Sequence, residues 1–179
     1  MTKTPFKLLS LACALLPAFA QATFLTVPAS VGSHPANQNP VEVAADCQHT
    51  PTSFRCVKFL YNHDGDTLTV SIPDVHPLFG QKVSVRIFGI DTPELYSRDS
   101  CEHEAALVAQ KFVRAMLLRG KKLELHKVQR DKYFRILADV RVDDVSVSQE
   151  LIARGLAYPY FGGTKQTIDW CPARSVVID

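Results

Sequence analysis

Three short segments of the chain hold carboxylates, and two of them also hold an arginine; these residue types suit chemistry on a phosphate group. They are Asp64-Gly65-Asp66-Thr67, then Arg86 with Asp91-Thr92-Pro93-Glu94, and then Asp131-Lys132-Tyr133-Phe134-Arg135. Aspartates at strand ends and a backbone carbonyl are hard oxygen ligands, which suit Ca²⁺ and do not suit soft metals. Arginines bind phosphate oxygens through paired hydrogen bonds, and a glutamate beside a metal can hold a water molecule. Combined, such groups make up a site for phosphodiester hydrolysis.

Each segment taken alone also fits a structural role, because Asp-Gly is a common turn and residues 131–135 suit a hairpin loop. Residues 121–135 hold six basic residues against two acidic ones, a positive stripe that a solvated face explains equally well. Arg86 differs, since it lies in a run of Val, Ile and Phe where an unpaired buried charge is costly. We therefore expect Arg86 to point into a site where carboxylates and a phosphate pair with it.

The elements that position these residues follow from hydrophobic periodicity. Strand patterns cover residues 56–61, 66–72, 82–90, 121–128 and 135–142, and residues 73–80 read as a loop. Apolar residues at helical spacing predict a helix over 101–118, with Asp99 or Ser100 as its N-cap and Gly120 at its end. A turn at Asp143-Asp144 and a short helix over 148–155 follow. This order of elements predicts a small α+β domain, most naturally a five-stranded barrel.

The three segments together resemble the thermonuclease, or staphylococcal nuclease-like, family. That family carries D-G-D-T, then R-x-x-x-x-D-T-P-E, then D-K-Y-G-R, and residues 58–160 of this chain carry closely matching segments in the same order. The resemblance implies an OB-type β-barrel of five strands with packed helices.

The resemblance also implies a metal-binding group and a catalytic carboxylate. Asp66 and Asp91 would bind Ca²⁺ through their side chains, and Thr92 would bind it through its main-chain carbonyl. Glu94 would act as the general base or hold the attacking water.

A second implied group binds the substrate. Arg86 and Arg135 would hold the scissile phosphate, and Lys132 and Tyr133 would contact a neighbouring phosphate of DNA or RNA.

The chain departs from the family pattern in three places. Phe134 replaces the glycine that precedes the second arginine, so we expect that loop to differ in conformation. The segment from Asp66 to Arg86 is longer than in the type member, and we expect this to change a surface hairpin. Only 19 residues follow Tyr160, so the long C-terminal helix of the type member is expected to be shortened or absent. Tyr158 and Tyr160 fit either base stacking or core packing.

The N-terminal residues predict export. Residues 1–22 combine Lys3 and Lys7 with an apolar run and two small-x-small cleavage sites, which is typical of a signal peptide and not of a membrane anchor. A lipoprotein site at Cys13 is the less favoured alternative. Residues 23–52 hold four prolines and no lasting periodicity, so we expect an extended or mobile arm before a nuclease-like domain over residues 53–179.

Composition says little about partners. With 179 residues, 46% hydrophobic and 21% charged, the chain has room for one domain with a core. Loss of the two leader lysines would leave 18 basic against 18 acidic residues, so net charge does not point to a partner. We expect a periplasmic or secreted monomer without a membrane anchor after cleavage.

Four cysteines remain after the leader, which in an exported chain predicts two disulfides with three possible connectivities. We favour Cys47–Cys56, which closes a short loop, with Cys101–Cys171, which would tie the chain end to the start of the long helix. The alternative is a zinc site that adds His49 and His63 to Cys47 and Cys56, and its spacing fits no zinc pattern well.

These features predict an exported, Ca²⁺-dependent nuclease that hydrolyses DNA and RNA with little sequence specificity. One alternative is a degenerate member of the same fold that binds nucleic acid without cleaving it. It is disfavoured because Arg86, Glu94 and Arg135 are all present. Another is a periplasmic structural module, which would have no need of a carboxylate–arginine group.

Overall fold

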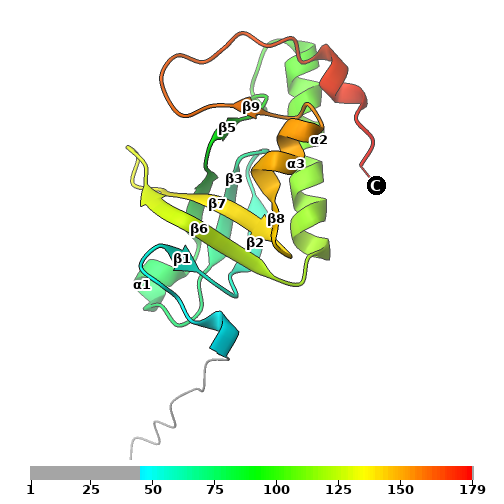
Figure 1. Ribbon diagram of the computed structural model, residues 1–179. Coiled ribbons are helices and arrows are strands. Elements are labelled where there is room, and N and C mark those ends of the chain that lie inside the picture. Colours follow the sequence, from blue (N-terminus) through cyan, green and yellow to red (C-terminus); the bar gives the residue numbers. More distant parts are fainter. Residues whose placement is uncertain (1–44, 179) are drawn as a thin grey trace, which may run out of the picture. The chain divides into compact units, whose positions relative to one another are not determined.

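The computed structural model describes residues 45–178 (Figure 1), which belong to the unit formed by residues 41–179. The predicted signal peptide, residues 1–22, and residues 23–44 of the predicted arm lie outside the described residues. No helix within residues 45–178 has both the length and the apolar character needed to cross a membrane.

Seven strands form the main sheet, in the order β1-β6-β7-β4-β3-β2, with β8 paired to β7. β4 and β7 run parallel and the other pairs are antiparallel. The strands are β1 Ser53–Phe54, β2 Lys58–Asn62, β3 Thr67–Ser71, β4 Val83–Ile87, β6 Leu123–Arg130, β7 Ile136–Val142 and β8 Val145–Ser146.

The strand pairing follows an open path, which differs from the closed five-stranded barrel predicted from the sequence. β2 and β1 stand at opposite ends of the path, and among the described residues they do not pair with each other. One backbone hydrogen bond joins the start of β2 to the start of β6, from the Val57 N–H to the Leu123 carbonyl at 3.0 Å. The domain is therefore α+β with a sheet that is not closed by a continuous ladder.

The long helix α2, Ser100–Arg119, covers one side of the sheet (Figure 1) and supplies much of the core. Asp99 is its N-cap, because the Asp99 carboxylate accepts the Glu102 N–H at 2.9 Å. Gly120 ends the helix where a side chain would collide with Val142. The buried face of α2 consists of Ala105, Ala106, Ala109, Phe112, Val113 and Leu117, which matches the predicted helical period.

Two shorter helices complete the α content. α3, Val147–Ala153, follows β8 and buries Val147 and Leu151. α1, Pro77–Gly80, lies in the segment that the sequence predicts as a loop. The imidazole of His76 caps α1 by accepting the Leu78 N–H at 3.2 Å, and Pro77 begins the turn, so local capping makes a helical turn where prolines suggested none.

A separate two-stranded sheet carries part of the site. β5, Ile90–Asp91, pairs antiparallel with β9, Tyr158–Pro159, and the register places Asp91 opposite Tyr158. The predicted strand over 82–90 is broken before β5, because Gly89 takes a φ of 82° that few other residues adopt. This bend brings the Asp91 segment to a strand that follows it by more than sixty residues.

The C-terminal segment holds a short 3₁₀ helix, η2 Cys171–Ser175, and no long helix within the described residues. η2 lies beside α2 (Figure 1), and a disulfide joins Cys171 to Cys101 in the first turn of α2. Trp170 is 8% exposed and its ring packs 6.1 Å from that of Tyr158. The bridge and the Trp170 contact therefore fix the chain end against the domain.

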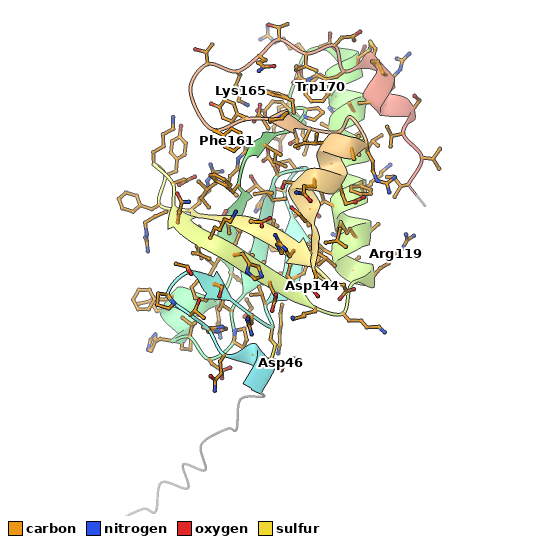
Figure 2. The ribbon with its side chains drawn as sticks, in the orientation of Figure 1. Asp46, Arg119, Asp144, Phe161, Lys165 and Trp170 are labelled. Carbon is orange, nitrogen blue, oxygen red and sulfur yellow. A yellow bond between two sulfur atoms is a disulfide. The ribbon has the colours of Figure 1, made fainter. Side chains whose placement is uncertain are left out.

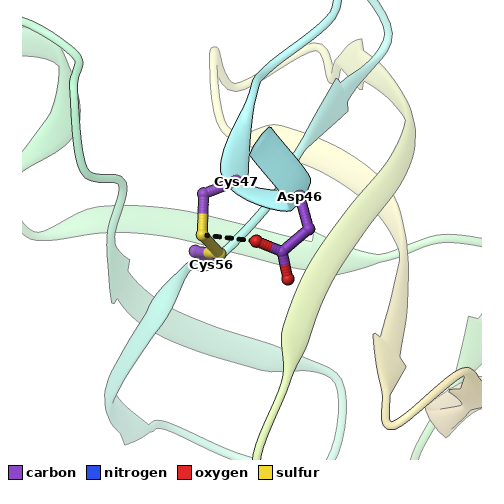
Figure 3. Close-up of side chains that lie close together, drawn as sticks. All are labelled: Asp46, Cys47 and Cys56. Atoms are coloured by element: carbon purple, nitrogen blue, oxygen red, sulfur yellow. Dashed lines mark hydrogen bonds between the residues drawn. A yellow bond between two sulfur atoms is a disulfide. The ribbon is translucent and has the colours of Figure 1, made fainter. Parts of the chain in front are cut away.

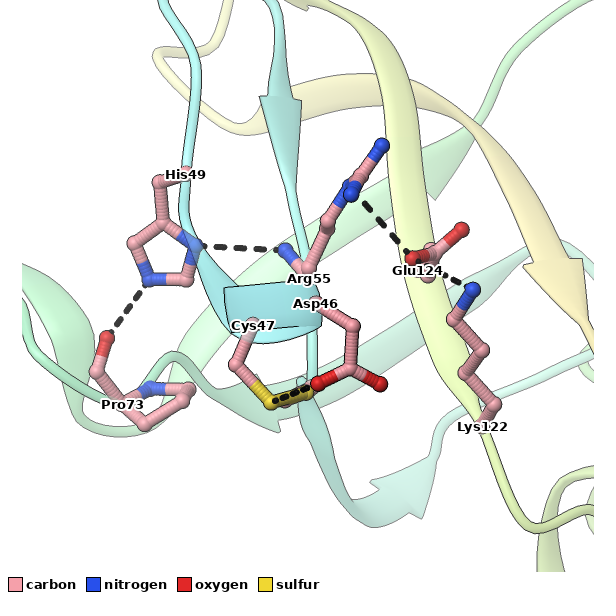
Figure 4. The surroundings of a disulfide bond; sticks show 8 residues. Asp46, Cys47, His49, Arg55, Pro73, Lys122 and Glu124 are labelled. Carbon is pink, nitrogen blue, oxygen red and sulfur yellow. Dashed lines mark hydrogen bonds and ion pairs between the residues drawn. A yellow bond between two sulfur atoms is a disulfide. The ribbon is translucent and has the colours of Figure 1, made fainter. Parts of the chain in front are cut away.

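The second disulfide, Cys47–Cys56, is also the pairing favoured from the sequence, and it ties residues 45–52 to the domain. His49 strengthens this attachment, since its Nε2 bonds the Pro73 carbonyl at 2.7 Å and its Nδ1 accepts the Arg55 N–H at 3.2 Å (Figure 4). The last part of the predicted arm is therefore held against the domain.

Removal of the long bridge should weaken the fold and the site together. The cysteines are 70 positions apart, for which the chain-entropy relation gives about 4 kcal/mol as an upper value. We expect Cys101→Ser/Cys171→Ser to lower the free energy of unfolding by between about 2 and 4 kcal/mol in urea denaturation. Turnover should also fall, because the bridge anchors the helix that follows the Glu94 turn.

Cys47→Ser/Cys56→Ser is the matched control. The Cys47–Cys56 bridge closes a loop of only 9 positions, so its removal should lower the free energy of unfolding by less. An unchanged melting temperature and turnover in the Cys101/Cys171 variant would show that the long bridge merely secures the chain end.

Candidate active site

An arginine that bridges two buried aspartates lies at the centre of the site. The antiparallel register of β3 and β4 places Arg86 opposite Thr67, next to Asp66 at the start of β3. Arg86 forms an ion pair with Asp66 through Nη1, and its Nη2 lies 2.8 Å from Asp91 Oδ1. Asp66 and Asp91 are only 2% and 3% exposed, so Arg86 supplies the counter-charge that their burial requires.

The two aspartates have further partners that fix their orientation. Asp66 Oδ2 accepts the Thr92 N–H at 3.2 Å and the Thr92 hydroxyl at 3.0 Å. Asp91 Oδ2 accepts the Tyr158 hydroxyl at 2.9 Å. Burial, and then the hydrogen bond to the Asp91 carboxylate, raise the pKa of Tyr158, so this hydroxyl remains a donor. Tyr158 is thus a buried residue that holds Asp91.

The turn before β3 depends on Asp64 and Gly65. Asp64 Oδ1 accepts the N–H groups of Asp66 at 3.0 Å and Thr67 at 2.7 Å, which shapes the turn. A Cβ at Gly65 would lie 2.9 Å from both Ala109 and Thr92, so α2 and the Thr92 segment leave room only for glycine. This packing brings Asp66 against the segment that carries Asp91 and Thr92.

Glu94 lies at the open edge of this group, with its side chain 58% exposed. Its Oε1 lies 2.6 Å from the ammonium nitrogen of Lys165, which also lies 3.1 Å from Asp91 Oδ2. Burial works against the Lys165 charge, but the hydrogen bonds with Glu94 and Asp91 outweigh it and raise the pKa of Lys165. The sequence motifs give no signal for Lys165, which follows Glu94 by 71 positions.

The hairpin between β6 and β7 orients the second arginine. Asp131 accepts the N–H groups of Tyr133 at 2.8 Å and Arg135 at 2.9 Å through Oδ1, and Arg135 Nε at 2.7 Å through Oδ2. Burial would raise the pKa of Asp131, but the hydrogen bonds from Arg135 and Tyr133 outweigh it and lower the pKa. Lys132 Nζ and Arg135 Cζ lie 5.1 Å and 5.4 Å from the centroid of the Tyr133 ring.

Phe134 keeps a backbone conformation that glycine favours. Its φ is 63°, in the left-handed region, and its side chain is exposed. A residue with a Cβ takes on about 1 kcal/mol of backbone strain in this region. The expected difference from the loop of the family stays a prediction.

A cleft of about 570 Å³ brings the predicted site residues together. Every one of them except Asp91 lines it, and Asp91 lies behind Arg86, Tyr158 and Lys165. Tyr160 lines the cleft as well, while Tyr158 does not, so the two tyrosines left open by the sequence differ in placement. The cleft also gains residues that the motifs do not identify, namely Phe88, Phe161, Gly162, Gly163 and Lys165.

The chemistry of Asp66 and Asp91 fits a hard cation, because Arg86 holds two carboxylates together and carboxylate oxygens are ligands that such ions prefer. Within residues 45–178, the only three metal-binding side chains with ligand atoms within 4.8 Å of one another are Asp46, Cys47 and Cys56 (Figure 3). Their two sulfurs form a disulfide and cannot bind zinc, so the zinc alternative is wrong. Within the described residues, Glu94 does not form a three-carboxylate cluster with Asp66 and Asp91.

Comparison with known proteins points to one family. The family model described as "Staphylococcal nuclease homologue" matches residues 84–169. Endonuclease YncB of Bacillus subtilis (strain 168) is 34% identical over 147 residues, covering 78% of this chain and 67% of that protein. The SPbeta prophage-derived endonuclease YokF of the same organism is 39% identical over 107 residues, covering 57% of this chain and 34% of YokF. Thermonuclease of Staphylococcus intermedius is 32% identical over 101 residues, covering 54% of this chain and 56% of that protein.

Proposed function

Since the chain belongs to the staphylococcal nuclease family and is a nuclease, we propose that it is an exported, Ca²⁺-dependent enzyme that cleaves DNA and RNA with little sequence specificity. The observation that carries the proposal is the Arg86 bridge between buried Asp66 and Asp91, at a cleft that Glu94 and Arg135 also line.

Different residues of the site would bind the metal ion and the phosphate. Asp66 and Asp91 would hold Ca²⁺ with the Thr92 carbonyl, and the bound ion would polarise the phosphate and offset its charge. Arg86 and Arg135 bind the scissile phosphate and stabilise the negative charge that gathers on its oxygens as water attacks. Their guanidinium groups are already oriented by aspartates, so little reorganisation is needed.

Glu94 takes a proton from the attacking water or holds that water in line with the phosphorus atom. Its exposure at the edge of the cleft suits this role, because water must reach it. Lys132 and Tyr133 lie on the same hairpin as Arg135 and would contact a neighbouring phosphate.

Export is supported by the signal-peptide pattern of residues 1–22 and by two disulfides, which persist in oxidising compartments. We propose a periplasmic or secreted monomer. We also propose that the sheet curves into an OB-type barrel, although its strand pairing is not continuous. The hydrogen bond from the Val57 N–H to the Leu123 carbonyl would lie where the two ends of the sheet meet.

Incubation of the purified mature protein with single- and double-stranded DNA and RNA tests the function. We expect all four substrates to be cleaved with millimolar Ca²⁺ and cleavage to stop when a chelator is added, because so few protein ligands bind Ca²⁺ weakly, with a Kd on the order of 10⁻⁴–10⁻³ M. Full activity after exhaustive chelation would contradict the metal requirement. Binding of nucleic acid without cleavage would support the degenerate alternative.

A further inference from the structure

The segment between β9 and η2 forms a loop over the cleft that is held at both ends. At its start, the Tyr160 N–H donates to the Gly89 carbonyl at 2.9 Å, and the Tyr160 hydroxyl donates to the Gly163 carbonyl at 2.8 Å. At its end, Trp170 is buried and Cys171 is bonded to Cys101. Phe161, Lys165 and Trp170 all come from this segment (Figure 2). Lys165 is therefore presented to the site by a loop of fixed ends.

Gly162 and Gly163, in the middle of this loop, have backbone conformations that favour glycine. Both have a positive φ, 104° and 93°, and a Cβ at either position would meet no atom within 4 Å. The glycines are thus required by backbone conformation and not by close packing. The Lys165 side chain is itself 49% exposed, so solvent reaches the ammonium that pairs with Asp91 and Glu94.

The Lys165 ammonium takes part in the charge balance of the site. Asp66, Asp91 and Glu94 carry three negative charges, and the cations that pair with them are Arg86 and Lys165. Lys165 bridges Asp91 Oδ2 at 3.1 Å and Glu94 Oε1 at 2.6 Å, which links a proposed metal ligand to the proposed base.

Both oxygens of Asp91 already have partners. Arg86 binds Oδ1, while Tyr158 and Lys165 bind Oδ2. A metal ion at Asp91 must therefore share an oxygen with one of these groups or displace it. Arg86 is 18% exposed and is also paired with Asp66, whereas Lys165 is half exposed on a glycine-containing loop. Displacing Lys165 from Asp91 therefore costs less free energy than displacing Arg86.

We infer that Lys165 is a positioning residue of the nuclease site, whose ammonium holds Asp91 and Glu94 together and competes with the metal ion for Asp91. The inference rests on the proposed Ca²⁺ site. Without the ion, Lys165 keeps the two carboxylates from repelling each other and fixes the Glu94 side chain at the edge of the cleft. When the ion binds Asp91, the Lys165 ammonium gives up its contact with Asp91 Oδ2.

Calorimetric titration of Ca²⁺ into protein without nucleic acid tests this competition apart from activity. We expect Lys165→Met to bind Ca²⁺ about tenfold more tightly than the wild type, since a unit positive charge beside the ligand is removed, and tenfold corresponds to about 1.4 kcal/mol. Lys165→Arg should restore near-wild-type affinity. Lys111→Met, a change of the same kind on the exposed face of α2, should leave the affinity unchanged.

Trp170 gives a second readout, because it is the only tryptophan of the chain and packs against Tyr158, which binds Asp91. We expect Ca²⁺ to change its fluorescence at about tenfold lower concentration in Lys165→Met than in the wild type. Equal or weaker Ca²⁺ binding by Lys165→Met, with normal binding by the wild type, overturns this inference alone. Failure of every variant to bind Ca²⁺ overturns the proposed metal site and the competition with it.

Discussion

Glu94→Gln should lower kcat by at least about 10²-fold, because removing a general base or a charged group that orients the nucleophile typically costs this much. A glutamine side chain is close to glutamate in size. Its neutral amide neither accepts a proton from water at neutral pH nor orients the water molecule through a negative charge. Initial rates of DNA cleavage at saturating Ca²⁺ and saturating substrate measure the effect.

The fold should tolerate this change, since the Glu94 side chain is more than half exposed. Glu150→Gln on α3 is the matched control, because it makes the same chemical change away from the cleft and should leave kcat unchanged. The Glu94 variant should still bind Ca²⁺, as Glu94 lies outside the proposed ligand set. Turnover near that of the wild type in Glu94→Gln would show that another group activates the water.

The main elements of the fold could be predicted because local patterns and tertiary structure agree there. The predicted helix over 101–118 becomes α2 at 100–119, and the predicted strands over 66–72 and 135–142 become β3 and β7 with ends shifted by a residue or two. The short elements could not be predicted from the sequence. β1 and β9 are two residues each, and their strand conformation comes from pairing with distant partners.

The segments of the candidate site could be predicted for a different reason. Asp66, Arg86, Asp91, Glu94 and Arg135 lie in short motifs with fixed spacing, so the residue types alone indicate a shared site. The structure adds the register of β3 and β4, which sets Arg86 beside Asp66, and the bend at Gly89, which turns Asp91 toward them.

Lys165 could not be predicted as a member of the site, and the sequence left the role of Tyr158 open. Their positions depend on β9 pairing with β5 and on the path of the chain toward the Cys101–Cys171 bridge, which no local pattern encodes. A lysine that follows two glycines in a polar segment is, by sequence alone, an ordinary loop residue.

Arg86→Met should damage both stability and activity, more than any other single change in the site. Loss of the guanidinium leaves Asp66 without its ion-pair partner in a setting where it is 2% exposed, and leaves Asp91 with Lys165 alone. Breaking a buried pair by removing one partner costs about 3 kcal/mol or more, and we expect a loss of that size in chelator by urea denaturation. The kcat should also fall by at least about 10²-fold, because a charge partner of the transition state is lost.

Calcium should restore part of the stability that Arg86→Met loses, since a divalent cation can neutralise the two carboxylates that lose the guanidinium. The gain in unfolding free energy between chelator and saturating Ca²⁺ should therefore be larger in Arg86→Met than in the wild type. Arg114→Met on the exposed face of α2 is the control, and its gain should equal that of the wild type. If Arg86→Met is as stable as the wild type in chelator, the bridge does not hold the aspartates in the core. If its deficit is the same with and without Ca²⁺, the ion does not bind Asp66 and Asp91, and the metal must be sought elsewhere in the cleft.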